Sequence, residues 1–135
     1  MKKIFNTLAS AILIMSLLTA ASPVPETTFS LVNGLPEVMN VGDTATVIVQ
    51  VESNQPFLFV QALPSFQYVG KGVVAVQGGD HEGRGTLATL EVTFRAKTPT
   101  TRMPGGVAPV HVVVGVRYPG GFVAVHEYLF NVRVP

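Results

Sequence analysis

The chain has 135 residues, of which 47% are hydrophobic and 13% are charged, and its formal net charge is +1. The charged fraction is about half of the ~25% usual for soluble domains, which argues against a nucleic-acid-binding protein. The length suits one domain, and the absence of cysteine excludes thiol nucleophiles, thiolate metal sites and disulfides.

The first 21 residues have the three-part form of a secretory signal. Lys2 and Lys3 give a basic start, the run from Ile4 to Ala21 is apolar, and its small final residues allow cleavage before Ser22. We therefore expect residues 1–21 to be a signal peptide. The alternative is an uncleaved N-terminal anchor helix, although 18 residues span only ~27 Å of a hydrocarbon core about 30 Å thick. Both interpretations place the domain outside the cytoplasm, secreted, at the cell surface or in the periplasm.

The rest of the chain has the two-residue period of β-strands. Residues 22–26 contain two prolines and are interpreted as a linker, and residues 27–135 as one domain. Apolar and polar residues alternate in seven segments that are separated by glycine, proline and asparagine. This pattern predicts an all-β fold, an antiparallel two-sheet sandwich of immunoglobulin-like type with about seven strands. The expected strands are 28–32, 44–51, 57–63, 67–77, 86–95, 110–116 and 122–134.

The last two strands form the clearest predicted hairpin, with Pro119 and Gly120 in its turn. A two-residue loop would place His111 and His126 on one face of the sheet, whereas a shift of one residue would separate them. Two histidines without a third ligand make a weak metal site, so we interpret both as ordinary sheet residues.

No other motif indicates chemistry. Asp80-His81-Glu82 is flanked by glycines and is interpreted as a solvated polar turn. The serines lack a nucleophile elbow, the acids form no recognisable catalytic pair, and no glycine-rich loop precedes a helix. We therefore expect a protein that is not an enzyme and uses no metal or cofactor.

A cluster of aromatic residues is the one candidate binding site. Phe57, Phe59, Phe66 and Tyr68 surround two prolines in a segment whose alternation is irregular. The ordinary interpretation is that they belong to the sandwich core. The alternative is an exposed docking surface. The strand has apolar residues of both parities, so a loop, the N-terminal segment or a partner must cover one of its faces.

Two segments resemble a known family. Gly42-Asp43-Thr44-Ala45-Thr46-Val47 and the later strand Gly85–Lys97, with the sequence GTLATLEVTFRAK, are similar to two recurring strands of bacterial extracellular cohesin-like and Ig-like sandwich modules. The resemblance covers these strands only, and the segment between them lacks the cohesin pattern Y-D-P-x-x-L. It implies an extracytoplasmic binding or scaffolding module, and no dockerin-binding residue carries over.

These observations lead to an expectation about function. We expect an exported, non-catalytic structural or interaction module of the cell envelope or surface, such as an accessory subunit of a larger assembly. Its partners would be other envelope or extracellular proteins, or a second copy joined by edge-strand pairing through residues 22–32. No nucleic acid is expected, and contact with a membrane would be made only through residues 1–21. The alternative is a carbohydrate-binding module, which the lack of tryptophan disfavours.

Overall fold

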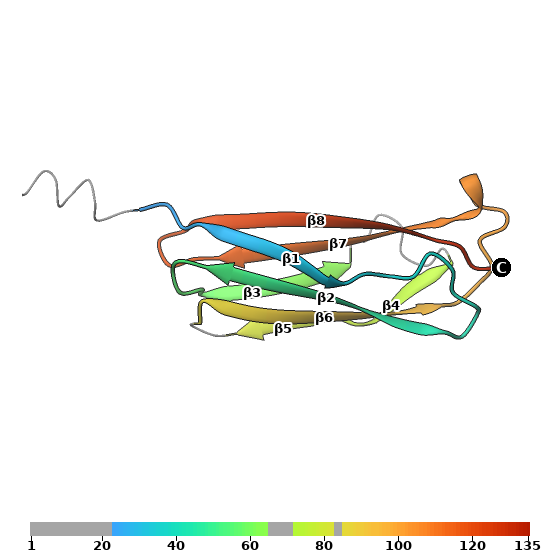
Figure 1. Ribbon diagram of the computed structural model, residues 1–135, viewed down its shortest axis with the longest axis horizontal. Helices are drawn as coiled ribbons and strands as arrows, with labels where there is room; N and C mark the ends of the chain where they lie inside the picture. The colour runs from blue at the N-terminus through green and yellow to red at the C-terminus, as the bar shows by residue number, and fades with distance from the viewer. Residues whose placement is uncertain (1–22, 65–71, 83–84) are drawn as a thin grey trace, which may run out of the picture.

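The computed structural model describes residues 23–64, 72–82 and 85–135, so the predicted signal or anchor, residues 1–21, lies outside the described part. The described part forms an elongated stack of strands (Figure 1). Each of the seven expected strands coincides at least in part with an observed one. The strands are β1 (Thr27–Asn33), β2 (Thr44–Ser53), β3 (Phe59–Pro64), β4 (Val73–Gln77), β5 (Gly79–Glu82), β6 (Leu87–Ala96), β7 (Ala108–Arg117) and β8 (Val123–Val132).

The strands form two antiparallel sheets. The first sheet has the order β1-β2-β6-β4 and the second has the order β5-β3-β7-β8. All pairings between neighbouring strands are antiparallel. The first sheet has the A-B-E-D order of an immunoglobulin fold, and β3-β7-β8 has its C-F-G order, with β5 added beside β3. The predicted all-β, immunoglobulin-like sandwich is therefore confirmed.

The core lies between the sheets, where the alternation predicted it. Successive strand residues point to opposite faces, so every second residue along β7, most of β6 and the middle of β2 is buried and contributes to one hydrophobic cluster. The inward residues of β2, β3, β6 and β7 are mostly valine and alanine, which suits a thin space between two sheets. They include Val47, Val49, Val51, Leu90, Val92, Phe94, Val60, Ala62, Val110, Val112, Val114 and Val116.

One passage of the chain changes sheets. β4 pairs with β6 in the first sheet, and β5 pairs with β3 in the second. Gly79 is buried at this crossing, where a Cβ atom would lie 2.5 Å from the carbonyl oxygen of Glu91 on β6. Only glycine allows the two backbones to approach this closely. The interpretation of residues 80–82 as a turn was wrong, because their backbone pairs with β3 as part of β5.

The final hairpin has a different register from the predicted one. Gly120 and Gly121 both have positive φ, 92° and 94°. The loop between Tyr118 and Phe122 is therefore three residues long instead of two, and Tyr118 N–H donates to the Phe122 carbonyl. This extra residue shifts the pairing by one.

The N-terminal part of the described chain is paired within its own sandwich. β1 pairs with β2 along its length. Before it, the Glu26 N–H donates to the side chain of Asn54, and Gln55 donates to the Pro23 carbonyl. The segment expected to pair with a neighbouring molecule is therefore already used in the fold. No helix of the described residues has the length and apolarity needed to cross a membrane.

Candidate functional site

The outer faces of the two sheets differ in chemistry. On the first sheet, the outward residues of β2 and β6 are mostly polar, and cross-strand neighbours include Thr46 with Thr93 and Gln50 with Thr89. The hydroxyls of Thr46 and Thr93 are hydrogen-bonded to each other at 2.9 Å. This face has the composition of a solvated sheet surface.

The outer face of the second sheet is largely apolar. β7 pairs in continuous register with β3 on one side and β8 on the other, and its own inward residues are fully buried in the core. The outward positions of the three strands therefore share one surface. They include Phe59, Leu63, Val113, Val123, Val125 and Leu129, which we call the apolar face. A sheet with apolar residues on both sides is typical of a sheet that is covered on both sides.

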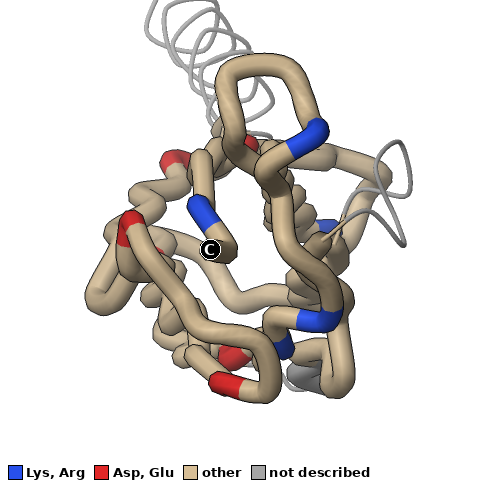
Figure 2. Tube along the Cα trace, turned by 90° about the vertical axis from the view of Figure 1, so that its right-hand side faces the viewer, with Lys and Arg blue, Asp and Glu red and all other residues tan. Residues whose placement is uncertain are grey.

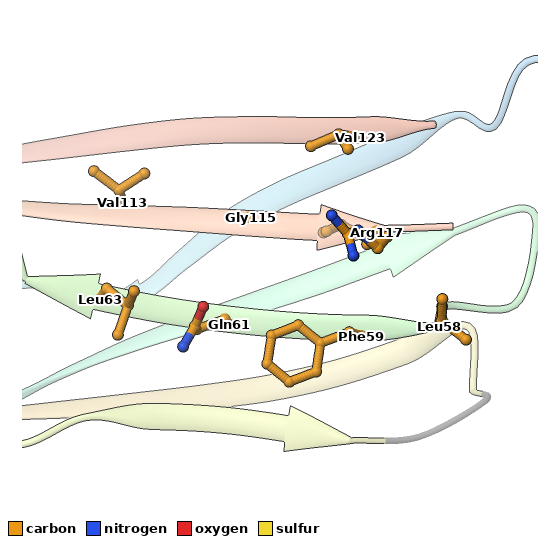
Figure 3. A pocket seen from close by; sticks show the side chains of 9 residues that line it. Leu58, Phe59, Gln61, Leu63, Val113, Gly115, Arg117 and Val123 are labelled. Carbon is orange, nitrogen blue, oxygen red and sulfur yellow. The ribbon is translucent and has the colours of Figure 1, made fainter. Parts of the chain in front are cut away.

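The apolar face is hollowed near the hairpin. A groove of about 500 Å³ lies between β3, β7 and β8, with Leu58, Phe59 and Val123 along its sides. Gly115 lies in the middle of it, and a Cβ atom at this position would have no neighbour within 4 Å. Figure 3 shows the Phe59 ring, the Gln61 amide and the Arg117 guanidinium on the same side of the sheet, with Gly115 on β7, which carries no side chain, between β3 and β8. The missing side chain thus contributes to the hollow.

A few polar groups accompany these apolar side chains. Arg117 is exposed and lies opposite Phe59 on β3, and Gln61 lies opposite Gly115. Farther along the same face, His111 Nδ1 forms a close contact with the carboxylate of Glu127 on β8. Ligand-binding pockets are typically lined by apolar side chains with a few polar groups, and this groove has the same composition.

The structure separates the four residues of the predicted docking surface. Phe57 is 1% exposed and packs in the core against Tyr118, with ring centroids 6.0 Å apart, so it is not part of an exposed surface. Phe59 is half-buried and lines the groove. Phe66 and Tyr68 lie outside the described residues. Phe57 therefore belongs to the core, and Phe59 lines the groove; of the two described residues in this set, only Phe59 does so.

No sequence motif indicated the residues that β7 and β8 contribute to the groove. Val113, Gly115 and Val123 are more than 50 positions away from Phe59 in the chain, and only the strand order brings them beside it. The signal was the run Val112-Val113-Val114, because three consecutive apolar residues place apolar side chains on both faces of a strand.

The two histidines lie on opposite faces. His111 is opposite Leu129 on the outer face, whereas His126 is opposite Val114, whose side chain points into the core. The shared face expected from a two-residue loop was therefore wrong. His126 stacks on Phe29 of β1 with centroids 5.3 Å apart and meets the edge of Tyr128, and burial raises the pKa of Tyr128. The described residues contain no group of three or more metal-ligating side chains.

Comparisons with known proteins give similarity at the level of the fold. No protein-family model matches the sequence, and no curated protein matches it. Among solved structures, E. coli alpha-2-macroglobulin in its native conformation is similar at 16% identity and a TM-score of 0.46. The match covers 84% of this chain but 7% of the macroglobulin.

Two smaller proteins are similar over nearly their whole length. They are a FixG-related protein from Vibrio parahaemolyticus, with a TM-score of 0.41, and murine CRIg, with a TM-score of 0.38. Each is 11% identical, and each match covers 82% of this chain and 98% of the other. Because these TM-scores are low, the fold assignment rests on the strand order. None of the matches favours the cohesin family in particular.

Proposed function

We propose that this chain is an exported, non-catalytic interaction module that binds another envelope or extracellular protein through the apolar face. The observation that carries the proposal is the contrast between the two outer faces. On the first sheet the outward residues of β2 and β6 are mostly polar, while the second sheet exposes Val123, Val125 and Leu129 beside a groove. Contiguous exposed apolar surface of this kind marks interaction sites in soluble proteins.

The groove indicates what the partner presents to it. Its walls are apolar and the space above Gly115 is open, so a branched or aromatic side chain fits there. Arg117 at the hairpin end offers a cation to an acidic group beside that side chain. The partner is therefore a protein segment with an apolar anchor and an adjacent carboxylate.

Charge makes a smaller contribution than apolar contact. Without the two lysines of the predicted signal, seven of the nine basic residues remain beside all eight acidic residues. Figure 2 shows charged positions of both signs among many uncharged ones at the end where the C-terminus lies. We therefore expect binding to depend weakly on salt concentration.

The experiment uses a matched pair of leucines. Leu58 lines the groove and is 51% exposed, whereas Leu87 on β6 is 53% exposed and lies on the first sheet. A photo-crosslinking amino acid is placed at each position in the producing cell. We expect position 58 to give one discrete adduct with a different protein and position 87 to give none.

The captured protein is then purified and titrated. We expect Leu58→Lys to weaken its affinity by about tenfold or more, because a buried interface would have to accommodate an unpaired charge. Leu87→Lys should leave the affinity unchanged. Equal adducts at both positions, or equal affinities of the two variants, would contradict the proposal.

The carbohydrate-binding alternative gains no support from the described residues. Sugar platforms use exposed flat rings, but Tyr118 is buried and Tyr128 is half-buried beside His126. The alternative therefore depends on Tyr68, which is outside the described part. Retention on polysaccharide that is lost in Tyr68→Ala would support it.

A further inference from the structure

The edges of the two sheets are protected unequally. Unpaired edge strands invite pairing with other chains, and proteins limit this with short strands, irregularities or covering segments. In the described part of the chain, β4 has five residues and a register shift, and β5 has four residues. β1 has seven residues and a register shift between Leu31 and Asn33. These three edges are poor templates for a long ladder.

β8 has none of these protections along most of its length. It is ten residues long, pairs with β7 without a register shift, and contains no proline, glycine, lysine or arginine. Within the described residues, a segment around Val38 lies beside its C-terminal end, where it forms a parallel bridge with Arg133. No described residue pairs with the outer side of β8 from Val123 to Asn131, and this open edge lies at the top of Figure 1.

The hydrogen bonds at Arg133 show which backbone groups face that open edge. The Arg133 N–H donates to the Glu37 carbonyl, and the Arg133 carbonyl accepts from the Met39 N–H. Both groups of Arg133 therefore point away from β7. Alternate residues of a strand direct their backbone groups to the same side, so the odd-numbered residues of β8 offer their N–H and C=O groups outward. The outward set is Val123, Val125, Glu127, Leu129 and Asn131.

We propose that β8 pairs in antiparallel fashion with β8 of a second copy of this chain, which joins the two second sheets into one. A two-fold axis perpendicular to the sheets makes this contact self-complementary, because each strand supplies the ladder that the other one lacks. The pairing uses the edge instead of the groove. It therefore goes beyond the proposed function and does not depend on it.

The residue pattern selects a register. Two-fold pairing places a residue opposite itself, and pairing centred on Glu127 would bring two carboxylates together, which is destabilising. Pairing centred on His126 avoids this and places Val125 opposite Glu127 and Val123 opposite Leu129. All four are outward residues whose backbone groups are available for the ladder. The shorter overlap also keeps the second copy away from the segment that covers Arg133.

Two features of β8 favour a second copy of the chain as its partner. A strand of matching length is present in every copy, and its exposed Val123, Val125 and Leu129 are apolar. The only formal charge within β8 is that of Glu127, which His111 of the same chain contacts, so in the register centred on His126 no two like charges of β8 lie directly opposite each other. The joined sheet would carry two grooves on one continuous apolar face.

The first experiment compares two valines with nearly equal exposure. Val125 on β8 is 61% exposed, and Val32 on β1 is 60% exposed. Sedimentation equilibrium is performed on the protein with its natural N-terminus over a range of concentrations. We expect a monomer–dimer equilibrium whose dissociation constant rises about tenfold or more in Val125→Lys, because lysine on an edge opposes pairing. Val32→Lys should behave like the wild type.

The second experiment reports the register. The chain has no cysteine, so a single introduced cysteine links only two copies. In the proposed register the two His126 residues face each other as a non-hydrogen-bonded pair with Cα atoms ~4.5 Å apart, within the range that a disulfide spans. We expect His126→Cys to form dimers faster under mild oxidation than Glu127→Cys, and faster than Ser30→Cys on β1.

The outcomes distinguish this proposal from the proposed function. A monomer at all concentrations, an equal effect of the two lysine variants, or equal crosslinking at positions 126 and 30 would overturn the pairing of β8. Faster crosslinking at position 127 would overturn the register centred on His126. The adduct at position 58 with a different protein tests the groove separately, and it is expected whether or not the chain dimerises.

Discussion

At the scale of single residues, Tyr118 connects three parts of the fold. It is buried at the hairpin, and its hydroxyl donates to Ser53 Oγ at 2.8 Å and is hydrogen-bonded to the Thr27 hydroxyl. Ser53 ends β2 and Thr27 begins β1, so one hydroxyl joins both sheets where the described chain enters the sandwich. A buried tyrosine requires such partners for its polar atom.

Removing that hydroxyl should lower stability without disturbing packing. We expect Tyr118→Phe to lower the free energy of unfolding by about 1–2 kcal/mol, because the Thr27 hydroxyl loses its hydrogen bond to Tyr118 and Ser53 Oγ keeps only the one from the Gln55 N–H. Chemical denaturation measures this difference. Tyr128→Phe is the control, since its hydroxyl has no hydrogen bond within the described residues. Equal losses in the two variants would show that the network does not stabilise the fold.

At the scale of elements, the sheet change between β4 and β5 depends on one of two adjacent glycines. A Cβ atom at Gly79 would collide with the β6 backbone, whereas one at Gly78 would meet nothing within 4 Å. The two positions have the same residue type and are neighbours in the chain. They therefore form a matched pair for testing whether close backbone approach fixes the crossing.

We expect Gly79→Ala to destabilise the protein by about 1–3 kcal/mol, which is the usual cost of inserting atoms into a packed site. Gly78→Ala should change the free energy of unfolding by less than about 0.5 kcal/mol, as surface substitutions do. Thermal or urea denaturation of both variants checks this. If both alanines are tolerated, the crossing does not require the contact with Glu91.

Much of the sandwich was predictable because alternation is a local signal. The alternation of apolar and polar residues predicted strands at 44–51 and 86–95, and the structure buries the apolar side chains of Val47, Val49, Leu90 and Val92 in them. β5 was not predictable, since its sequence Gly-Asp-His-Glu has little strand propensity and becomes a strand by pairing with β3.

The apolar face was only partly predictable from the sequence. The mixed parity around Phe59 indicated that one face of this strand needed a cover, and the structure shows an apolar outer face there. Phe57 lies in the core although it has the same parity as the outward-facing Phe59, because β3 begins at Phe59 and the chain before it does not continue the alternation. The wrong register of the histidines arose from Gly121, whose positive φ adds a third residue to the loop.

At the scale of the whole molecule, one sheet serves the core on one side and the apolar face on the other. On the first sheet the outward residues of β2 and β6 are mostly polar, so the two outer surfaces of the sandwich differ in chemistry. A substitution at Gly115 tests whether the groove is a binding site. Glycine within a strand weakens the fold, so effects on stability and on binding can be separated at this position. Stability alone would favour a larger residue at this open position.

The most direct measurement is the affinity of the captured partner for Gly115→Val compared with the wild type. We expect Gly115→Val to stabilise the fold but to weaken binding. The substitution should raise the free energy of unfolding by about 0.5–1 kcal/mol, since it removes a strand glycine. It should weaken binding by about tenfold or more, because it fills the space above the sheet. A partner that binds Gly115→Val as tightly as the wild type would contradict the claim that the groove is the binding site.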